Sequence, residues 1–175
     1  MRLADSLGLV PSIVPAPALL KRRMDEDDFT GLARKIRERV AAQGFMQLVG
    51  ADLSTLEPGG ATISVSRRPE LLQQDGYFHG GVTAFLVDNG TTIAAATWLR
   101  PGQTCLTADY KLNLLAPAKG DRLICRARVV KAGRLMSVVA ADVVCVENGE
   151  ETPTAVALAT VAIVSAAAVG SMGHA

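Results

Sequence analysis

The sequence predicts a single α+β domain in which long antiparallel strands wrap around one buried helix. The first observation is the stretch at residues 82–99. It is almost wholly apolar or small, is too long for a typical strand, and places apolar side chains on every face of a helix. The second is that four strand-like segments follow it, each about 10–12 residues long and separated by short turns. A sheet built from such hairpins can cover a single helix with one face.

The composition limits the possible classes of function. The chain has 175 residues, of which 49% are hydrophobic and 20% charged, so we expect one compact domain with a real core. The formal net charge of +1 gives no overall electrostatic footprint for nucleic acid or for an anionic membrane. We therefore expect neither a nucleic-acid partner nor a membrane partner.

The cysteines point to a reducing compartment. Cys105, Cys125 and Cys145 are odd in number, lie 20 residues apart and form no CxxC pair, which argues against a disulfide framework and a structural zinc site. Each lies in an apolar, strand-like segment, so we expect small buried side chains. With only two histidines, one of them in the C-terminal tail, we expect no metal site.

The two ends of the chain are predicted to lie outside the domain. Residues 1–24 are apolar, but Asp5 and three prolines interrupt them, and the basic residues follow the apolar stretch, which is the wrong order for an export signal. We expect a loosely ordered N-terminal extension, with a true start at Met24 as an open alternative. The domain then spans 25–166, a flexible tail spans 167–175, and the protein is expected in the cytoplasm.

The elements before the central helix are read from caps and turns. Asp27 or Asp28 can cap a helix that Gly44 ends. A strand at 45–53, a turn at 57–60, a returning strand at 61–66, a short helical turn after Pro69 and a glycine-rich loop at 75–81 are expected next. The later strands are expected at 104–115, 121–131, 135–146 and 154–164.

The junction His79-Gly80-Gly81 is the first candidate for chemistry. A helix start carries free backbone N–H groups and the positive end of the helix dipole. Two glycines there allow a ligand oxygen to approach closely, and the same N–H groups can stabilise the oxyanion that forms when a carbonyl is attacked. Taken alone, two such glycines are more often simply a turn.

The second candidate is Asp88, which lies inside the apolar helix. A buried carboxylate is costly unless it is paired, and no Lys or Arg lies within a helical turn of it. It either caps a backbone group or has a function. Gly90 is also unfavourable in mid-helix by about 1 kcal/mol, so we expect another backbone to pack closely there.

Together these features resemble the hotdog-fold acyl-CoA thioesterases of the phenylacetate-degradation and 4-hydroxybenzoyl-CoA type. The resemblance covers residues 40–165. It rests on His79-Gly80-Gly81-Val82, on an acid nine positions after the histidine (Asp88), and on Gln73 and Gly76 six and three positions before it. The strand at 107–118, which begins with Thr107, and the hairpin at 131–134 also look like those of the family.

The resemblance implies the hotdog fold and the hydrolysis of an aryl- or medium-chain acyl-CoA. In that interpretation the Gly80 N–H polarises the thioester carbonyl, and His79 and Gln73 hold the loop, with Gln73 also able to position water. Asp88 is the general base or the nucleophile, and Thr107 bonds the carboxylate of Asp88 or the attacking water. No cofactor is implied beyond the coenzyme A of the substrate.

Geometry then requires two subunits. Gly80 and Asp88 are eight residues apart on one helix, which is about 12 Å. The reacting carbonyl carbon has to lie within about 3–3.5 Å of the attacking group and close to the oxyanion donor. Two antiparallel helices from two subunits satisfy this, so we expect a homodimer, with a dimer of dimers left open. Small residues are expected to allow the two helices to approach: Gly90, Thr91, Ala94 and Ala95.

Coenzyme A carries phosphates, so basic residues are expected at the mouth of the site. The strongest candidate is Arg134 at the hairpin turn, with Gly133 beside it and Gly81 at the helix start. The other candidates are Arg67, Arg68, Lys119 and Lys131. For each of these residues, a solvated surface charge is an equally good interpretation as a phosphate contact.

Two other functions remain as alternatives. A non-catalytic acyl-CoA-binding hotdog module would not need Asp88, so an acid at this spacing favours the enzyme. A hydratase or dehydratase would place a histidine a few residues from the acid, but only His174 follows Asp88 in this chain.

Overall fold

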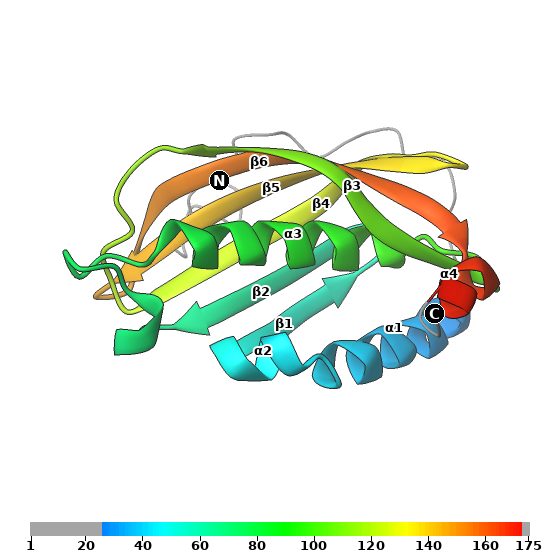
Figure 1. The fold of residues 1–175 in the computed structure, drawn as a ribbon, viewed down its shortest axis with the longest axis horizontal. Coiled ribbons are helices and arrows are strands. Elements are labelled where there is room, and N and C mark those ends of the chain that lie inside the picture. The colour runs from blue at the N-terminus through cyan, green and yellow to red at the C-terminus, as the bar shows by residue number, and fades with distance from the viewer. Residues whose placement is uncertain (1–25, 173–175) are drawn as a thin grey trace.

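The computed structural model describes residues 26–172, which form one six-stranded antiparallel sheet with a long helix against it (Figure 1). The strands are β1 (Ala51–Glu57), β2 (Gly60–Ser66), β3 (Gln103–Leu114), β4 (Arg122–Ala132), β5 (Met136–Glu147) and β6 (Glu150–Ser165). Their order is β1-β2-β4-β5-β6-β3, so β1 and β3 form the two edges. The helices are α1 (Glu26–Ala41), α2 (Gly44–Val49), α3 (Gly80–Ala96) and α4 (Ala166–Met172), with a 3-10 turn η2 at Pro69–Leu71.

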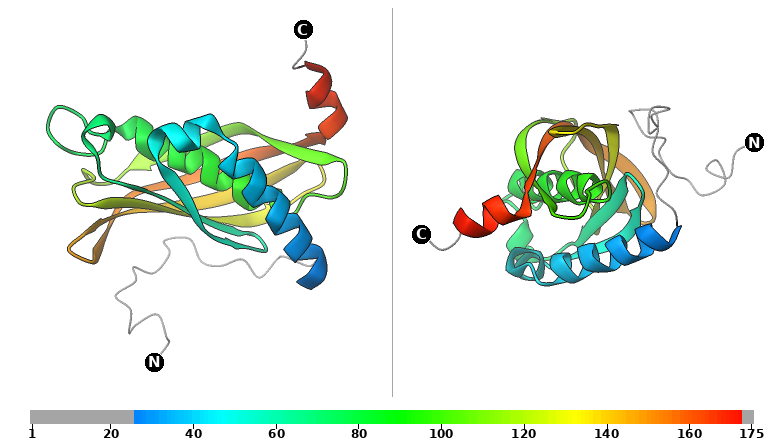
Figure 2. Two further views of the ribbon diagram at one scale, coloured as in Figure 1. Left: turned by 90° about the horizontal axis from the view of Figure 1, so that it is seen from below. Right: turned by 90° about the vertical axis from the view of Figure 1, so that its right-hand side faces the viewer.

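The central helix is α3, and the sheet curls around it (Figure 2). Most of its apolar side chains are buried, Leu86 and Val87 completely. The helix packs against β4 most extensively and also against β2, β3 and β5. The helix ends at Ala96, three residues earlier than predicted. The predicted α+β class and the hotdog fold are confirmed.

A glycine lets α3 approach the sheet closely. A Cβ on Gly90 would lie 3.2 Å from Cys125 Sγ and 3.6 Å from Ala127 Cβ, so the helix would have to move away from β4. A close contact is therefore present at Gly90, but the neighbours are side chains of β4 and β2 and not the backbone that the sequence analysis expected. The expectation that small residues open α3 to a second helix is wrong, because all four are buried against the chain's own fold: Gly90, Thr91, Ala94 and Ala95.

The four long strands predicted after the central helix are all present as β3 to β6. Asn148 and Gly149 form the turn between β5 and β6 with φ values of 52° and 84°, the left-handed conformation that Asn and Gly adopt most readily. The register of β3 against β6 shifts between Thr107 and Asp109. This irregularity bends the edge strand at a residue that the sequence singles out for function.

The predicted strand at 45–53 is wrong in its first half. Residues 44–49 form α2, whose buried residues Met46 and Val49 are spaced by three positions, as on one face of a helix. Gly50 ends α2 with a φ of 67°, and β1 begins only at Ala51. A short apolar run does not by itself separate a helix from a strand, and here the packing of α2 against β1 decides it.

The ends of the domain add one element. The chain continues from β6 into α4 at Ala166–Met172, where the sequence predicts the start of a tail. The predicted extension at 1–24 lies outside the described residues. Within residues 26–172 no helix is both long and apolar enough to cross a membrane.

We predict that Thr97 fastens the end of α3 to the hairpin between β1 and β2. Its hydroxyl, which is fully buried, accepts the Gly59 N–H at 2.8 Å and donates to Ala94 O at 2.6 Å. Thr97→Val should lower the free energy of unfolding by about 1–3 kcal/mol, because the Gly59 N–H loses its acceptor. Urea unfolding measures this, with Thr97→Ser as the control that keeps the hydroxyl. A valine variant as stable as the wild type would contradict the assignment.

Candidate active site

A tightly bonded loop leads from η2 to the start of α3. The Gln73 N–H donates to Tyr77 O at 2.9 Å, and the Gly76 N–H donates to Gln73 O at 3.0 Å. Gly76 has a φ of 78°, which a residue with a side chain rarely adopts. The Arg67 guanidinium ties this loop to the sheet, because it donates to Gly76 O at 2.6 Å and to Gly120 O at 3.2 Å. The loop is thus held by bonds from its own chain.

His79 is the N-cap of α3. Its Nδ1 accepts the Gly81 N–H at 2.9 Å, and its carbonyl accepts the Val82 N–H at 2.9 Å. A Cβ on Gly81 would lie 2.9 Å from the same Nδ1, so a glycine is needed at this position for the cap to form. The Gly81 N–H, which the sequence suggests for coenzyme A, is therefore engaged by the imidazole.

The Gly80 N–H is in a different situation. It is the first N–H of the helix, and within residues 26–172 it has no recorded acceptor. Gly80 is exposed, and a Cβ there would meet only Leu114 Cδ1, at 3.7 Å. A free donor at the positive end of a 17-residue helix can bind an oxygen that carries negative charge.

Asp88 lies on the one face of α3 that the sheet does not cover completely. It is half-buried, as are Phe85 and Thr92, whereas the opposite side of the helix is buried. Residues three and four apart on a helix share a face, so these side chains form one stripe. A carboxylate here avoids the full cost of burial and remains accessible to a ligand.

A chain of hydroxyls holds the carboxylate of Asp88. Thr107 Oγ1 donates to Asp88 Oδ1 at 2.6 Å, and Thr92 Oγ1 lies 2.8 Å from Thr107 Oγ1. A hydroxyl has one proton. Because Thr107 donates its proton in the hydrogen bond to the carboxylate, Thr92 has to be the donor in its bond to Thr107. The chain therefore runs from Thr92 through Thr107 to Asp88. The register shift after Thr107 bends β3 beside this contact.

The structure brings some of the predicted site residues together and separates others. Asp88 and Thr107 are in direct contact, whereas Gly80 lies eight residues back along α3. Gln73 is half-buried in the loop before the helix, and no hydrogen bond of its side chain is recorded within the described part of the chain.

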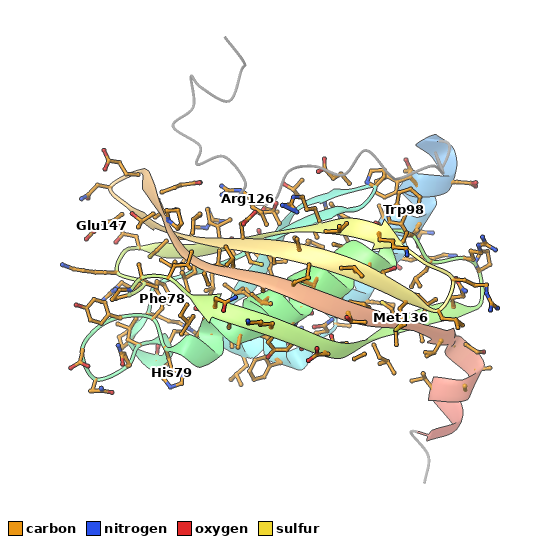
Figure 3. The ribbon with its side chains drawn as sticks, turned by 90° about the horizontal axis from the view of Figure 1, so that it is seen from above. Phe78, His79, Trp98, Arg126, Met136 and Glu147 are labelled. Carbon is orange, nitrogen blue, oxygen red and sulfur yellow. The ribbon has the colours of Figure 1, made fainter. Side chains whose placement is uncertain are left out.

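The predicted coenzyme A residues in the β4–β5 hairpin lie far from the start of α3 of the same chain. Gly133 donates its N–H to Met136 O at 3.0 Å, and a Cβ there would lie 2.4 Å from that oxygen, so the turn requires a glycine. Arg134 follows it and is exposed. Figure 3 shows Met136 and His79 at opposite ends of the molecule. One chain therefore does not bring Arg134 to its own Gly80.

The sequence analysis missed Thr92 and a cleft. Thr92 is four positions after Asp88, a spacing that places both on one helix face and provides the signal that could have found it. The cleft has a volume of about 820 Å³ and lies between α1, the second half of α3 and the start of β3. No sequence pattern predicts this cleft, because it depends on how α1 is placed relative to α3 and β3.

The three cysteines are largely or partly buried, and burial changes their chemistry. Burial raises the pKa of the Cys105 thiol to about 11, and burial together with the charge of Asp142 raises that of Cys125 to about 12. The pKa of Cys145 is raised to about 11, again mainly by burial. These thiols are protonated at neutral pH and react slowly. The described residues contain no group of three or more His, Cys, Asp or Glu side chains that could hold a metal ion.

A free amide donor and a hydroxyl-held carboxylate on one central helix can act on a polarised carbonyl. The fold and this pair of groups place the protein among the hotdog-fold hydrolases. A family model described as "Thioesterase superfamily" matches residues 75–152, which include His79, Asp88 and Thr107. The chain belongs to the thioesterase superfamily and is a thioester hydrolase by class.

Individual relatives agree with this placement. A thioesterase family protein of solved structure from Silicibacter pomeroyi is 34% identical, with a TM-score of 0.75, and the match covers 77% of this chain and 99% of that one. Human acyl-coenzyme A thioesterase 13 is 29% identical over 119 residues, which are 65% of this chain and 84% of that protein. The PaaI protein of E. coli, from the phenylacetic acid degradation operon, shares the fold with a TM-score of 0.68 at 17% identity, over 78% and 95% of the two chains.

We predict that the two glycines of the helix start respond differently to alanine. Gly81→Ala should lower the melting temperature, because the new Cβ pushes His79 out of its capping position, and a lost N-cap costs about 0.5–2 kcal/mol. Gly80→Ala should leave the melting temperature almost unchanged, because its Cβ has room. Thermal unfolding of both variants measures the difference. Equal losses in the two variants would show that the cap is not the reason for Gly81.

Proposed function

We propose that the chain hydrolyses acyl-CoA thioesters with aryl or medium-chain acyl groups, at sites that two copies of the chain share. The observation that carries the proposal is the carboxylate of Asp88, held at 2.6 Å by Thr107 on the accessible face of the central helix. The free Gly80 N–H supplies the complementary donor. The named relatives that act on acyl-coenzyme A support the choice of substrate.

Sharing the site follows from the length of α3. The eight residues between Gly80 and Asp88 span about 12 Å along the helix, too far for one thioester carbonyl to contact both groups. If two α3 helices lie antiparallel across a two-fold axis, Gly80 of each copy lies opposite Asp88 of the other. Each dimer then has two equivalent sites.

The edge of the sheet favours such a dimer. β3 is an edge strand, with one row of backbone N–H and C=O groups unpaired within the described chain. Leu106 and Leu114 on this strand are 47% and 62% exposed, and both are large apolar side chains. Pairing of β3 with β3 of a second copy would cover the edge and bring the two α3 helices together. A further pairing of dimers stays a prediction.

The proposed dimer also gives a role to Arg134, the basic residue in the hairpin between β4 and β5. Met136, two residues after Arg134, lies at the end of the molecule opposite to His79, the N-cap of α3 in the same chain (Figure 3). In an antiparallel pair that end adjoins the start of the other copy's α3. Arg134, presented by the Gly133 turn, is then placed to meet the phosphates of the coenzyme A whose thioester lies at the other copy's Gly80.

The proposed reaction consumes one water. The Gly80 N–H binds the thioester oxygen, and the Asp88 carboxylate takes a proton from water as the hydroxyl oxygen bonds to the carbonyl carbon. The carbon–sulfur bond then breaks, and the proton on Asp88 passes to the coenzyme A sulfur, giving a carboxylic acid and free coenzyme A. The alternative is direct attack by Asp88, which forms an anhydride that water hydrolyses. Neither route needs a cofactor.

A non-catalytic acyl-CoA-binding module is the second candidate. Binding alone would be served by the helix start and the basic hairpin, and would not call for a carboxylate fixed by two hydroxyls in series. That chain of hydroxyls favours the enzyme. A cytoplasmic location stays a prediction.

We predict that Asp88→Asn abolishes most of the activity and leaves the fold intact. The amide oxygen still accepts from Thr107, but it cannot take a proton from water, so kcat should fall by about 100- to 10,000-fold. Release of free thiol from octanoyl-CoA and phenylacetyl-CoA measures the rate. The protein's own thiols have raised pKa values, which keeps the background of a thiol-specific dye low. A variant with nearly normal turnover would make Asp88 structural.

A separate prediction concerns the sharing of the site. Two inactive variants, Asp88→Asn and a Gly80 variant with a bulky residue such as Gly80→Val, should regain activity when their subunits are exchanged. Random mixing should restore about a quarter of the wild-type rate, because half of the dimers are mixed and each carries one intact site. Subunit exchange is verified with differently tagged copies. No recovery despite exchange would place the whole site within one chain.

A further inference from the structure

The chemistry proposed above leaves a cleft beside the central helix unused. It lies where α1 runs beneath the second half of α3 and the start of β3 closes the far side (Figure 1). Its volume of about 820 Å³ is within the range of pockets that enclose small organic ligands. α1 packs against β1 and α2, which leaves this space between α1 and α3 open.

The floor of the cleft is apolar. Leu32, Ile36 and Val40 are spaced by four residues, so they form one stripe along α1 that faces the cleft. Ile93 and Ala96 line the opposite wall from α3. Four charged residues of α1 line the cleft, and all four are exposed, so their charges stay in water: Asp28, Lys35, Glu38 and Arg39.

The inner end of the cleft adjoins the hydroxyl chain. Asn89 and Thr92 from α3 and Cys105 from β3 all line it. Thr92 is bonded to Thr107, which is bonded to Asp88, and Cys105 Sγ lies 3.6 Å from Thr92 O. An acyl group whose carbonyl carbon lies at Asp88 therefore has this apolar space directly next to it.

We infer that the cleft binds the apolar tail of the acyl group and that α1 sets the length of tail that is accepted. The inference rests on the proposed thioesterase function and adds the substrate class, a saturated acyl chain of medium length. Each methylene that enters the cleft leaves water, which corresponds to about a fourfold gain in kcat/KM. The gain ends where the chain fills the cleft. The part of the chain that matches the family model, residues 75–152, does not include α1.

The test compares chain-length profiles of variants that narrow the cleft from both sides. Leu32→Trp fills it from α1, and Ala96→Leu fills it from α3; both residues are only partly buried, so larger side chains have room to enter the cleft. The matched control is Leu48→Trp on α2, a residue that is 68% exposed and lies outside the cleft. The measurement is kcat/KM of the full chain for acetyl-, butanoyl-, octanoyl- and dodecanoyl-CoA.

We expect the wild type and Leu48→Trp to prefer octanoyl-CoA. Leu32→Trp and Ala96→Leu should lower kcat/KM for octanoyl-CoA by at least about tenfold and leave that for acetyl-CoA within about twofold. Equal losses for all chain lengths, or no loss, would overturn the inference. A change of molar mass in light scattering for Leu32→Trp, together with equal losses, would instead make the cleft an interface between copies.

If no acyl-CoA is hydrolysed, the proposed function is wrong. The affinity of the chain for acyl-CoAs of different lengths then tests separately whether the cleft binds the acyl tail. Calorimetric titration should then give tighter binding for octanoyl-CoA than for acetyl-CoA in the wild type, with the difference lost in Leu32→Trp. Equal affinities of the wild type for the two ligands would remove the cleft as a site for the acyl tail.

Discussion

The structure depends on how an almost entirely apolar helix is enclosed. α3 can be stable in water only if most of its surface is covered, and the curled sheet covers every side except one stripe. Polar groups that must reach a ligand can lie only on that stripe or at the helix ends, because elsewhere they would be buried without partners. Asp88 and Thr92 lie on the stripe, and the free Gly80 N–H lies at the end.

This constraint links the chemistry to the edge of the sheet. Thr107 can reach the stripe only from the strand next to it, and β3 is that strand and also an edge. The edge strand that places Thr107 against Asp88 therefore also has backbone groups that can pair with another chain. The bonded carboxylate and the proposed sharing of the site between two chains both depend on the edge position of β3. The bulge after Thr107 belongs to the same arrangement, since it bends β3 where the contact is made.

Most of the fold could be predicted because its signals are local. The length of the apolar run identified α3, and the Asn148-Gly149 turn identified the hairpin between β5 and β6. The strand predicted at 45–53 is wrong over residues 45–49, because the apolar residues of this short run also fit one face of a helix, and contacts with β1 decide between the two. The prediction that Gly90 and Ala94 face a second helix is wrong for a similar reason. A small residue packs against a sheet as well as against a helix, so its size does not identify the neighbour.

Some parts of the candidate site could also be predicted from the sequence, and others could not. The family resemblance named Asp88 and Thr107 and predicted that Thr107 bonds either the carboxylate of Asp88 or the attacking water. The coordinates show the bond to Asp88 and add a second hydroxyl, that of Thr92, which the sequence analysis did not name. The cleft could not be anticipated, because its walls come from segments more than 50 residues apart, Leu32 on α1 and Ala96 on α3.

This separation has a functional meaning. The groups proposed for bond cleavage lie on α3 and β3, within the segment that matches the thioesterase superfamily. One wall of the cleft comes from α1, outside that segment. Asp88 is not among the residues that line the cleft, so the cleft lies between α1 and the carboxylate. A change in α1 can therefore alter which acyl tail fits without moving the carboxylate or its hydroxyls. In the proposed scheme, α1 selects the acyl tail while α3 and β3 carry the chemistry, and the cleft joins the two at the second half of α3.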